Sequence, residues 1–231
     1  MLFMQNVTKS YKLRHQTVVA LDDATLEIPD GDFVSLIGPS GSGKSSLLVM
    51  LGGMLTPTSG KVLLDGQSMY DLDVDQRARM RQAKIGFVFQ TFNLIPYLSA
   101  QENVQIPLFL SGMSAFEQLD RAAELLDRVG LGNRLDHKPM ELSVGQQQRV
   151  ALARMLANDP SIILADEPTG NLDPETSEQV IRYFEEFNRE GRTIVMVTHN
   201  PEAAERAKRV LQLRNGKIVD DRATLQCVGV A

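Results

Sequence analysis

Short apolar runs alternate with stretches in which apolar residues recur every three or four positions, and this pattern predicts a mixed α/β fold. In the first 90 residues the apolar positions form short runs that end near Asn, Asp or Gly, as strands do. The strands predicted here are Phe3–Val7, Val18–Ile28, Phe33–Ile37, Lys61–Gly66 and Ile85–Phe89. A single helix, over residues 46–51, is expected among them.

The middle of the chain, from about residue 91 to 158, follows helical spacing. One amphipathic stripe consists of Leu119, Ala122, Leu126 and Val129. Gly130 is expected to end that helix. A second helix through Val150–Leu156 should stop before Pro160, because a residue that precedes proline disfavours helical backbone. These helices predict a helical insertion into an α/β core.

Strands and helices alternate again after residue 160. The predicted elements are a strand at Ile162–Ala165, a helix at Pro174–Phe187, a strand at Thr193–Val197, and two strands, Val210–Leu213 and Lys217–Val219, that flank an Asn-Gly turn. Alternation of this kind is typical of a mainly parallel sheet covered by helices. We therefore expect one domain, with residues 1–90 and 159–231 in the core and residues 91–158 in the helical part.

Composition narrows the class of protein. The chain has 231 residues, 43% of them hydrophobic, and a net charge of −5 without a basic block, which argues against nucleic-acid binding through bulk charge. It contains no apolar run of 18 residues and no signal-peptide core, so we expect a soluble protein without a membrane span. Its single cysteine, Cys227, cannot form an internal disulfide, which favours a reducing compartment, and we assign it no role.

A glycine-rich segment, Gly38–Ser46, carries the strongest chemical signal. It fits the pattern G-x-x-x-x-G-K-[ST] between a strand and a helix, which is the context of a phosphate-binding loop. Its backbone N–H groups and the helix N-terminus would bind phosphate oxygens, Lys44 would reach the β- and γ-phosphates, and Ser45 would hold Mg²⁺. The candidate nucleotide-binding residues of this loop are Gly38, Pro39, Ser40, Gly41, Ser42, Gly43, Lys44, Ser45 and Ser46.

Two acidic residues end the apolar run that starts at Ile162. Asp166, at the end of a strand beside the phosphate loop, fits a carboxylate that holds Mg²⁺. Glu167 follows it, and because side chains alternate along an extended chain we expect Glu167 to point elsewhere. From there it could accept a proton from the water that attacks the γ-phosphate, which makes it the candidate catalytic base.

The segment Leu142–Gln146, which reads Leu-Ser-Val-Gly-Gln, completes a set of motifs that resembles the nucleotide-binding subunits of ABC transporters over nearly the whole chain. The family signature is Leu-Ser-Gly-Gly-Gln at the start of a helix. Here Ser143, Gly145 and Gln146 match it, and Val144 replaces the first glycine. The resemblance implies that these residues contact the γ-phosphate of ATP bound to a second subunit. Ser143 also fits an ordinary helix N-cap.

Other positions take a role only through this resemblance. Gln90 resembles the glutamine that contacts Mg²⁺ and the attacking water, and His199 resembles the histidine on the γ-phosphate. Asp173 lies in a segment similar to the loop that crosses the dimer interface, and Tyr11 is similar to the aromatic residue that stacks on adenine. His15 and His137 match no motif, and we expect both at the surface.

The resemblance implies an ABC ATPase fold: a P-loop core with a mainly parallel sheet, an N-terminal antiparallel β-subdomain and an inserted α-helical subdomain. It also implies an ATPase that uses Mg²⁺ and forms a head-to-tail homodimer around two ATP molecules. A membrane permease would contact residues near Gln90–Val104, which places the chain in the cytoplasm at the inner face of the membrane.

Two segments, Phe92–Val104 and Asp166–Asp173, resemble the lipoprotein-releasing and macrolide-exporter branch of the family. In that reading the apolar side chains of Phe92, Leu94, Ile95 and Pro96 would line a groove for the partner, and the alternative is that they form a local core for the helical insertion. The sequence leaves two alternatives open, a regulatory adaptor for a cell-division complex and a soluble ABC ATPase. A different P-loop enzyme, such as a kinase, would leave Ser143–Gln146 and His199 unexplained.

Overall fold

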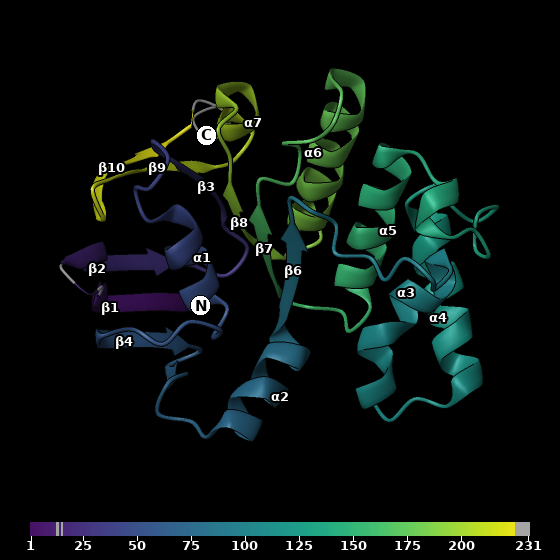
Figure 1. Cartoon of the computed structure of the whole chain (residues 1–231), viewed down its shortest axis with the longest axis horizontal. Coiled ribbons are helices and arrows are strands. Elements are labelled where there is room, and N and C mark those ends of the chain that lie inside the picture. The colour runs from purple at the N-terminus through teal and green to yellow at the C-terminus, as the bar shows by residue number, and fades with distance from the viewer. Residues whose placement is uncertain (13, 15, 225–231) are drawn as a thin grey trace.

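The computed structural model describes residues 1–12, 14 and 16–224, and two sheets organise them (Figure 1). The smaller sheet has the strand order β2-β1-β4-β5 and is antiparallel throughout. Its strands are β1 (Leu2–Lys12), β2 (Thr17–Ile28), β4 (Ser59–Leu64) and β5 (Gln67–Ser68). Cys227 and His15 lie outside the described residues, so no expectation about them is tested.

The larger sheet has six strands in the order β10-β9-β3-β8-β7-β6. These are β3 (Phe33–Ile37), β6 (Ile85–Phe89), β7 (Ile162–Asp166), β8 (Thr193–Val197), β9 (Arg209–Arg214) and β10 (Lys217–Ala223). All pairs are parallel except β9 with β10, which form the hairpin expected at Asn215-Gly216. The predicted mixed fold with a mainly parallel sheet is confirmed.

Helices cover the larger sheet and extend to one side of it (Figure 1). The helices that connect strands are α1 (Lys44–Leu51), α2 (Val74–Lys84), α6 (Pro174–Arg189) and α7 (Pro201–Glu205). Between β6 and β7 the chain forms α3 (Ala100–Gln105), η1 (Ile106–Leu110), α4 (Ala115–Arg128), η2 (Pro139–Glu141) and α5 (Val144–Leu156). Within the described residues, no helix has the length and apolar character that crossing a membrane requires.

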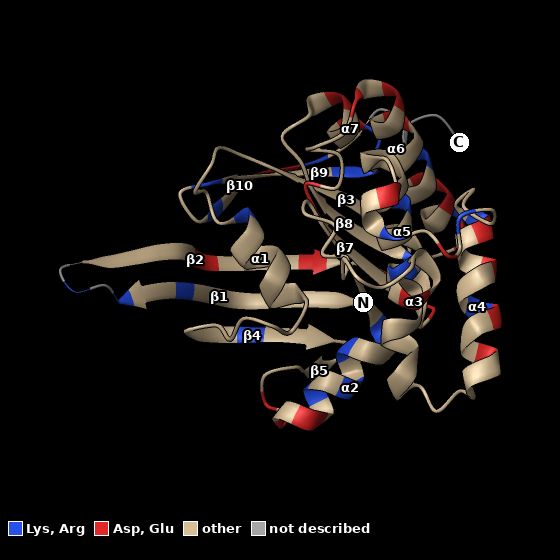
Figure 2. Ribbon diagram, turned by 45° about the vertical axis from the view of Figure 1, so that its right-hand side comes forward, with Lys and Arg blue, Asp and Glu red and all other residues tan. Residues whose placement is uncertain are grey.

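Helix α2 corrects the expectation of a single helix before residue 90. It has no buried residue, so it shows no apolar stripe to reveal it. A capping box starts it: the Asp73 side chain accepts from the N–H of Gln76, and the Gln76 side chain accepts from the N–H of Asp73. Figure 2 shows basic and acidic residues together on both α2 and α4, in keeping with the absence of a basic block in the sequence.

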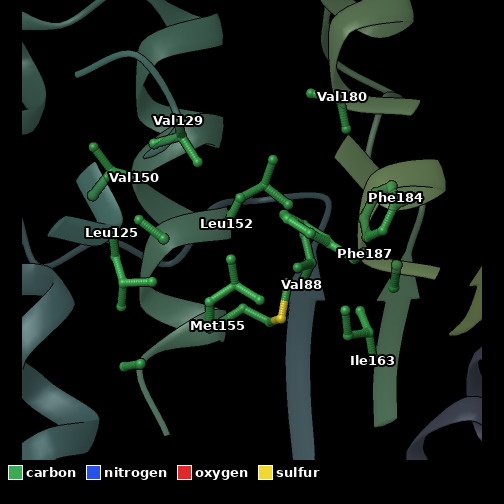
Figure 3. Close-up of a cluster of buried hydrophobic side chains, with 14 of the residues drawn as sticks. Val88, Leu125, Val129, Val150, Leu152, Met155, Ile163, Val180, Phe184 and Phe187 are labelled. Atoms are coloured by element: carbon green, nitrogen blue, oxygen red, sulfur yellow. The ribbon is translucent and has the colours of Figure 1, made fainter. Parts of the chain in front are cut away.

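Two hydrophobic cores lie on the two faces of the larger sheet, and β7 contributes to both. Ile162 and Leu164 join the core that contains α1 and the smaller sheet. Ile163 and Ala165 join the core that contains α4, α5 and α6. Figure 3 shows Ile163 and Phe184 in this second core, with Leu152 of α5. Burial on both faces explains why these strands read as continuous apolar runs.

Candidate active site

The parallel strands place the candidate residues at one edge of the larger sheet, because the carboxyl ends of parallel strands share an edge. The phosphate loop follows β3, Gln90 follows β6, Asp166 ends β7, and His199 comes two residues after β8. They border a cavity of about 430 Å³. The candidate residues that line it are Tyr11, Ser40, Gly41, Gly43, Lys44, Ser45, Ser46, Gln90, Asp166, Glu167 and His199.

Two glycines of the phosphate loop are required by close packing. Gly38 has φ 148°, and a Cβ there would lie 2.2 Å from the carbonyl oxygen of Leu213. Gly43, the left-handed residue before α1, has φ 105°, and a Cβ there would lie 2.2 Å from the carbonyl oxygen of Ala20. The loop is therefore fixed against β2 and β9, which holds its N–H groups in place for an anion.

Lys44 is bound by its own loop. Its Nζ donates to the carbonyl oxygens of Gly38, at 2.8 Å, and Pro39, at 2.9 Å. The residue is only 6% exposed. Burial lowers the pKa of Lys44, and the carboxylates of Glu167 and Asp166 oppose that shift. The cation and these carboxylates thus face one another across the cavity.

Ser45 and Asp166 come from separate elements and meet at the cavity. Ser45 Oγ lies 3.3 Å from Asp166 Oδ1, within a hydrogen bond. Among the described residues, no group of three or more His, Cys, Asp or Glu side chains could hold a metal ion. A pair of oxygen ligands fits Mg²⁺, which keeps several waters and takes further oxygens from substrate phosphates.

Glu167 departs from the expected geometry. Strand β7 ends at Asp166, and Glu167 has φ 49°, so the alternation of an extended chain does not apply to it. Its Oε2 accepts from the backbone N–H of His199 at 3.1 Å, and its Oε1 lies 3.0 Å from His199 Nε2. Burial raises the pKa of Glu167, and the hydrogen bond from His199 partly opposes this. The left-handed turn therefore directs the carboxylate to His199.

Gln90 and Tyr11 complete the cavity from two sides. Asn171 Nδ2 donates to the carbonyl oxygen of Gln90 at 3.1 Å, which links the end of β6 to the segment after Glu167. Tyr11, on β1, lines the cavity and is 40% exposed. Lys9 Nζ lies 5.2 Å from the centre of the Tyr11 ring.

Seven predicted residues are absent from the lining of this cavity: Gly38, Pro39 and Ser42 of the phosphate loop, and Ser143, Gly145, Gln146 and Asp173. Ser143 is the N-cap of α5 and accepts from the N–H of Gln146, as the N-cap interpretation expects. Asp173 is the N-cap of α6 and binds Thr176. Val144 is the first residue of α5, with 49% of its surface exposed. The candidate residues thus form two separate groups in one molecule.

Sequence reasoning missed Gln148, a fully buried residue of α5 that donates to the carbonyl oxygen of Pro168. The signal was present in the sequence. Gln148 lies three, four and seven residues before Ala151, Leu152 and Met155, so it is a polar residue on the apolar stripe of its helix.

Comparison with known proteins places this arrangement in a family. The sequence model of the ABC transporter family matches residues 21–170. A macrolide export ATP-binding/permease protein of Syntrophobacter fumaroxidans is 51% identical over 93% of this chain, which spans 30% of that longer protein. An ABC transporter ATP-binding protein of Thermotoga maritima is 49% identical over 92% of this chain and 91% of its own length.

Solved structures agree in fold and sequence. An ATP-binding cassette of Methanocaldococcus jannaschii, solved as a dimer in a post-hydrolysis state with ADP and phosphate, matches with a TM-score of 0.90 and 45% identity. That match covers 96% of this chain and 98% of the archaeal one. A second dimeric structure of the same cassette matches with the same TM-score and 46% identity. The chain therefore belongs to the ABC transporter family, as an ATP-binding and ATP-hydrolysing cassette.

Proposed function

We propose that two copies of this chain close around two ATP molecules and drive a separate membrane protein from the cytoplasmic face of the membrane. The observation that carries the proposal is the division of the site. The cavity gathers the phosphate loop, Asp166, Glu167 and His199, whereas Ser143 and Gly145 lie outside it. A second copy in head-to-tail orientation would supply the missing residues. The dimeric state of the archaeal relative supports this arrangement.

Each group would bind a different part of the nucleotide. The loop N–H groups and Lys44 hold the phosphates, and the ring of Tyr11 stacks on adenine. Ser45, Asp166 and Gln90 would hold Mg²⁺, which would supply positive charge to offset the charge that develops on the phosphates. Ser143, Gly145, Gln146 and Asp173 act on the ATP bound to the other copy.

Hydrolysis follows from the placement of Glu167. Its carboxylate accepts a proton from water while the water oxygen bonds to the γ-phosphorus, and the bond from that phosphorus to the bridging oxygen breaks to give ADP and phosphate. The backbone N–H of His199 orients the carboxylate, and the imidazole, whose Nε2 lies 3.0 Å from Oε1, would reach the γ-phosphate. Loss of the γ-phosphate removes the contacts that hold the two copies together.

A groove of about 900 Å³ beside Gln90 fits the membrane partner. Its apolar lining is formed by Met54, Ile85, Phe87, Phe89, Ile106, Pro107, Leu110, Met155 and Pro160. Phe92, Leu94, Ile95 and Pro96 are not part of it, and Leu94 packs against a buried core instead. The wall of this groove is provided mostly by α2, β6 and η1, and the four residues lie outside it. By likeness to the macrolide export relatives, the partner is of the exporter type that transmits motion across the membrane.

The variant Glu167→Gln tests the ATPase part of the proposal. It removes the base and leaves the phosphate loop intact, so turnover should fall by about 10²- to 10⁴-fold while ATP holds the dimer closed. Phosphate release and light scattering after size-exclusion chromatography measure the two effects. Glu124→Gln, an exposed change on α4, is the matched control. Normal turnover in Glu167→Gln would show that the base is another group.

The partner is tested by purifying the tagged chain from membranes in mild detergent. Leu110 is 82% exposed and lines the groove, so Leu110→Asp should release the membrane protein without unfolding the chain. Met140→Asp, a matched change at a residue 90% exposed outside the groove, should retain it. Co-purification of ribosomes or DNA-repair factors in place of a membrane protein would contradict the proposal.

A further inference from the structure

The buried side chain of Gln148 joins two parts of the chain that are far apart in sequence. Gln148 has no exposed surface, and its Nε2 donates to the carbonyl oxygen of Pro168 at 2.6 Å. Helix α5 belongs to the helical part of the chain, and Pro168 directly follows Glu167 in the turn after β7. The hydrogen bond therefore connects α5 to the turn that carries the carboxylate.

This turn needs support from its surroundings. Glu167 is a non-glycine residue in left-handed backbone, a conformation that persists only where neighbouring contacts hold it. Its N–H donates to Val197 O at 3.0 Å, and its carbonyl accepts from Gly170 N–H at 3.0 Å. The Gln148 amide adds a third bond one residue later, from a different element. The direction of the carboxylate thus depends in part on α5.

The same helix touches other parts of the site. At its start, a Cβ on Gly145 would lie 2.5 Å from Thr176 Cγ2, so the signature segment packs closely on α6. Near its end, the guanidinium of Arg154 donates to the carbonyl oxygens of Phe92 and Asn93, both at 2.6 Å, just after Gln90. Helix α5 is therefore in contact with three segments: the turn after β7, the start of α6 and the loop that follows Gln90.

The other half of the Gln148 amide has no partner. Gln148 Oε1 is buried without a hydrogen bond to any described residue. A buried acceptor without a partner destabilises the fold, whereas Nε2 satisfies the carbonyl of Pro168, a residue that is itself buried. The amide is therefore explained by the bond that it makes to Pro168.

We propose that Gln148 is a positioning residue that ties the signature helix α5 to the Glu167 turn. Through this link, a change in how α5 contacts the ATP of the second copy also changes the orientation of Glu167 in the same chain. The inference rests on the ATPase function proposed above. It predicts that loss of the Nε2 donor slows hydrolysis and leaves nucleotide binding unchanged. Loss of a side chain that acts only on folding would lower the rate of hydrolysis and the nucleotide binding together.

The test compares Gln148→Met with Gln147→Met in the full chain. Gln147 lies on the same helix and donates to the carbonyl oxygens of Pro139 and Leu142, both within the helical part, so the control loses hydrogen bonds but no link to the turn. In Gln148→Met, kcat should fall about 10- to 100-fold, because small displacements of a reacting group have effects of this size. Affinity for a non-hydrolysable ATP analogue should stay within about twofold of the wild type. A double variant with Glu167→Gln should still form the ATP-bound dimer.

Several results would overturn the inference. Equal kcat in the two glutamine variants would show that the bond to Pro168 does not position the base. Loss of analogue binding or of the trapped dimer in Gln148→Met would assign Gln148 to folding or binding, and so would failure of both Gln148→Met and Gln148→Leu to fold. An inactive wild-type chain would refute the proposed function, whereas an active one with an unaffected Gln148→Met variant would refute only this inference.

Discussion

The buried amide of Asn103 permits a quantitative prediction about stability. Asn103, on α3, has no exposed surface. Its Oδ1 accepts from Ile95 N–H at 2.8 Å, and its Nδ2 donates to the carbonyl oxygens of Ile95, Leu98 and Ser99 at 2.9–3.1 Å. One side chain thus fixes the loop that leads from Gln90 to α3. We predict that Asn103→Leu, which keeps the volume and removes these bonds, loosens this loop.

The size of the effect follows from the groups that lose their partner. Ile95 O still accepts from Leu98 N–H, and Ser99 O still accepts from the Asn103 backbone N–H. The N–H of Ile95 and the carbonyl of Leu98 are left without a hydrogen-bond partner. At about 1–3 kcal/mol for each buried orphaned group, and with a half-exposed loop that lets some water in, we expect a loss of about 2–4 kcal/mol. For a chain of this length that lowers Tm by about 4–16 °C.

Thermal unfolding followed by circular dichroism measures the shift, with Gln101→Leu as the matched control. Gln101 is on the same helix, and its side chain makes one hydrogen bond, from Nε2 to the carbonyl oxygen of Leu119 at 3.0 Å. Its loss should lower the stability by at most about 1 kcal/mol. If Asn103→Leu melts within about 2 °C of Gln101→Leu, the hydrogen bonds of Asn103 do not hold the loop and the reasoning is wrong.

Three further predictions concern the site. Because burial raises the pKa of Glu167 and the base must be ionised, kcat should fall as the pH drops through that raised pKa; an acid limb at or below pH 4.5 in the kcat–pH profile would contradict this. Gly145→Ala should destabilise the fold by about 1–3 kcal/mol through overpacking, and Thr176→Ser, which removes the methyl group 2.5 Å from the new Cβ, should restore much of the loss in urea unfolding. Removal of Mg²⁺ with a chelator should stop phosphate release, and added Mg²⁺ should restore it; hydrolysis that continues in excess chelator would rule out the roles given to Ser45 and Asp166.

The buried parallel strands were predictable because their residues are apolar on both faces. Phe33–Ile37, Ile85–Phe89 and Thr193–Val197 have the same bounds in the sequence prediction and in the structure. Helix α2 was not predicted, because a helix without a fully buried residue shows no periodic apolar stripe to detect. Its capping residues, Asp73 and Gln76, were the only local signal, and they lie three residues apart in a polar segment.

The candidate site was also predictable only in part. Motif spacing was sufficient to choose Lys44, Ser45 and Asp166, and parallel strands bring such residues to one edge. The conformation of Glu167 could not be inferred, because a left-handed non-glycine residue depends on surrounding contacts that the sequence does not reveal. Here they are its own bonds to Val197 and Gly170, and the bond from Gln148 to the next residue, Pro168. Gln148 could be recognised as a polar residue on the apolar stripe of its helix, but its partner, the carbonyl of Pro168, is known only once that helix has been packed against its neighbours.

The hydrogen bonds of Lys44 to Gly38 O and Pro39 O have a consequence for the nucleotide cycle. To turn more than one of its three N–H donors to a phosphate, its ammonium must give up one or both of these carbonyl acceptors, which take it back after product release. The free energy that Lys44 contributes to nucleotide binding is therefore a difference between two sets of contacts, and it is smaller than its charge alone suggests. This exchange of carbonyl for phosphate acceptors favours reversible binding of the nucleotide, which suits an ATPase that must release ADP and phosphate in every cycle.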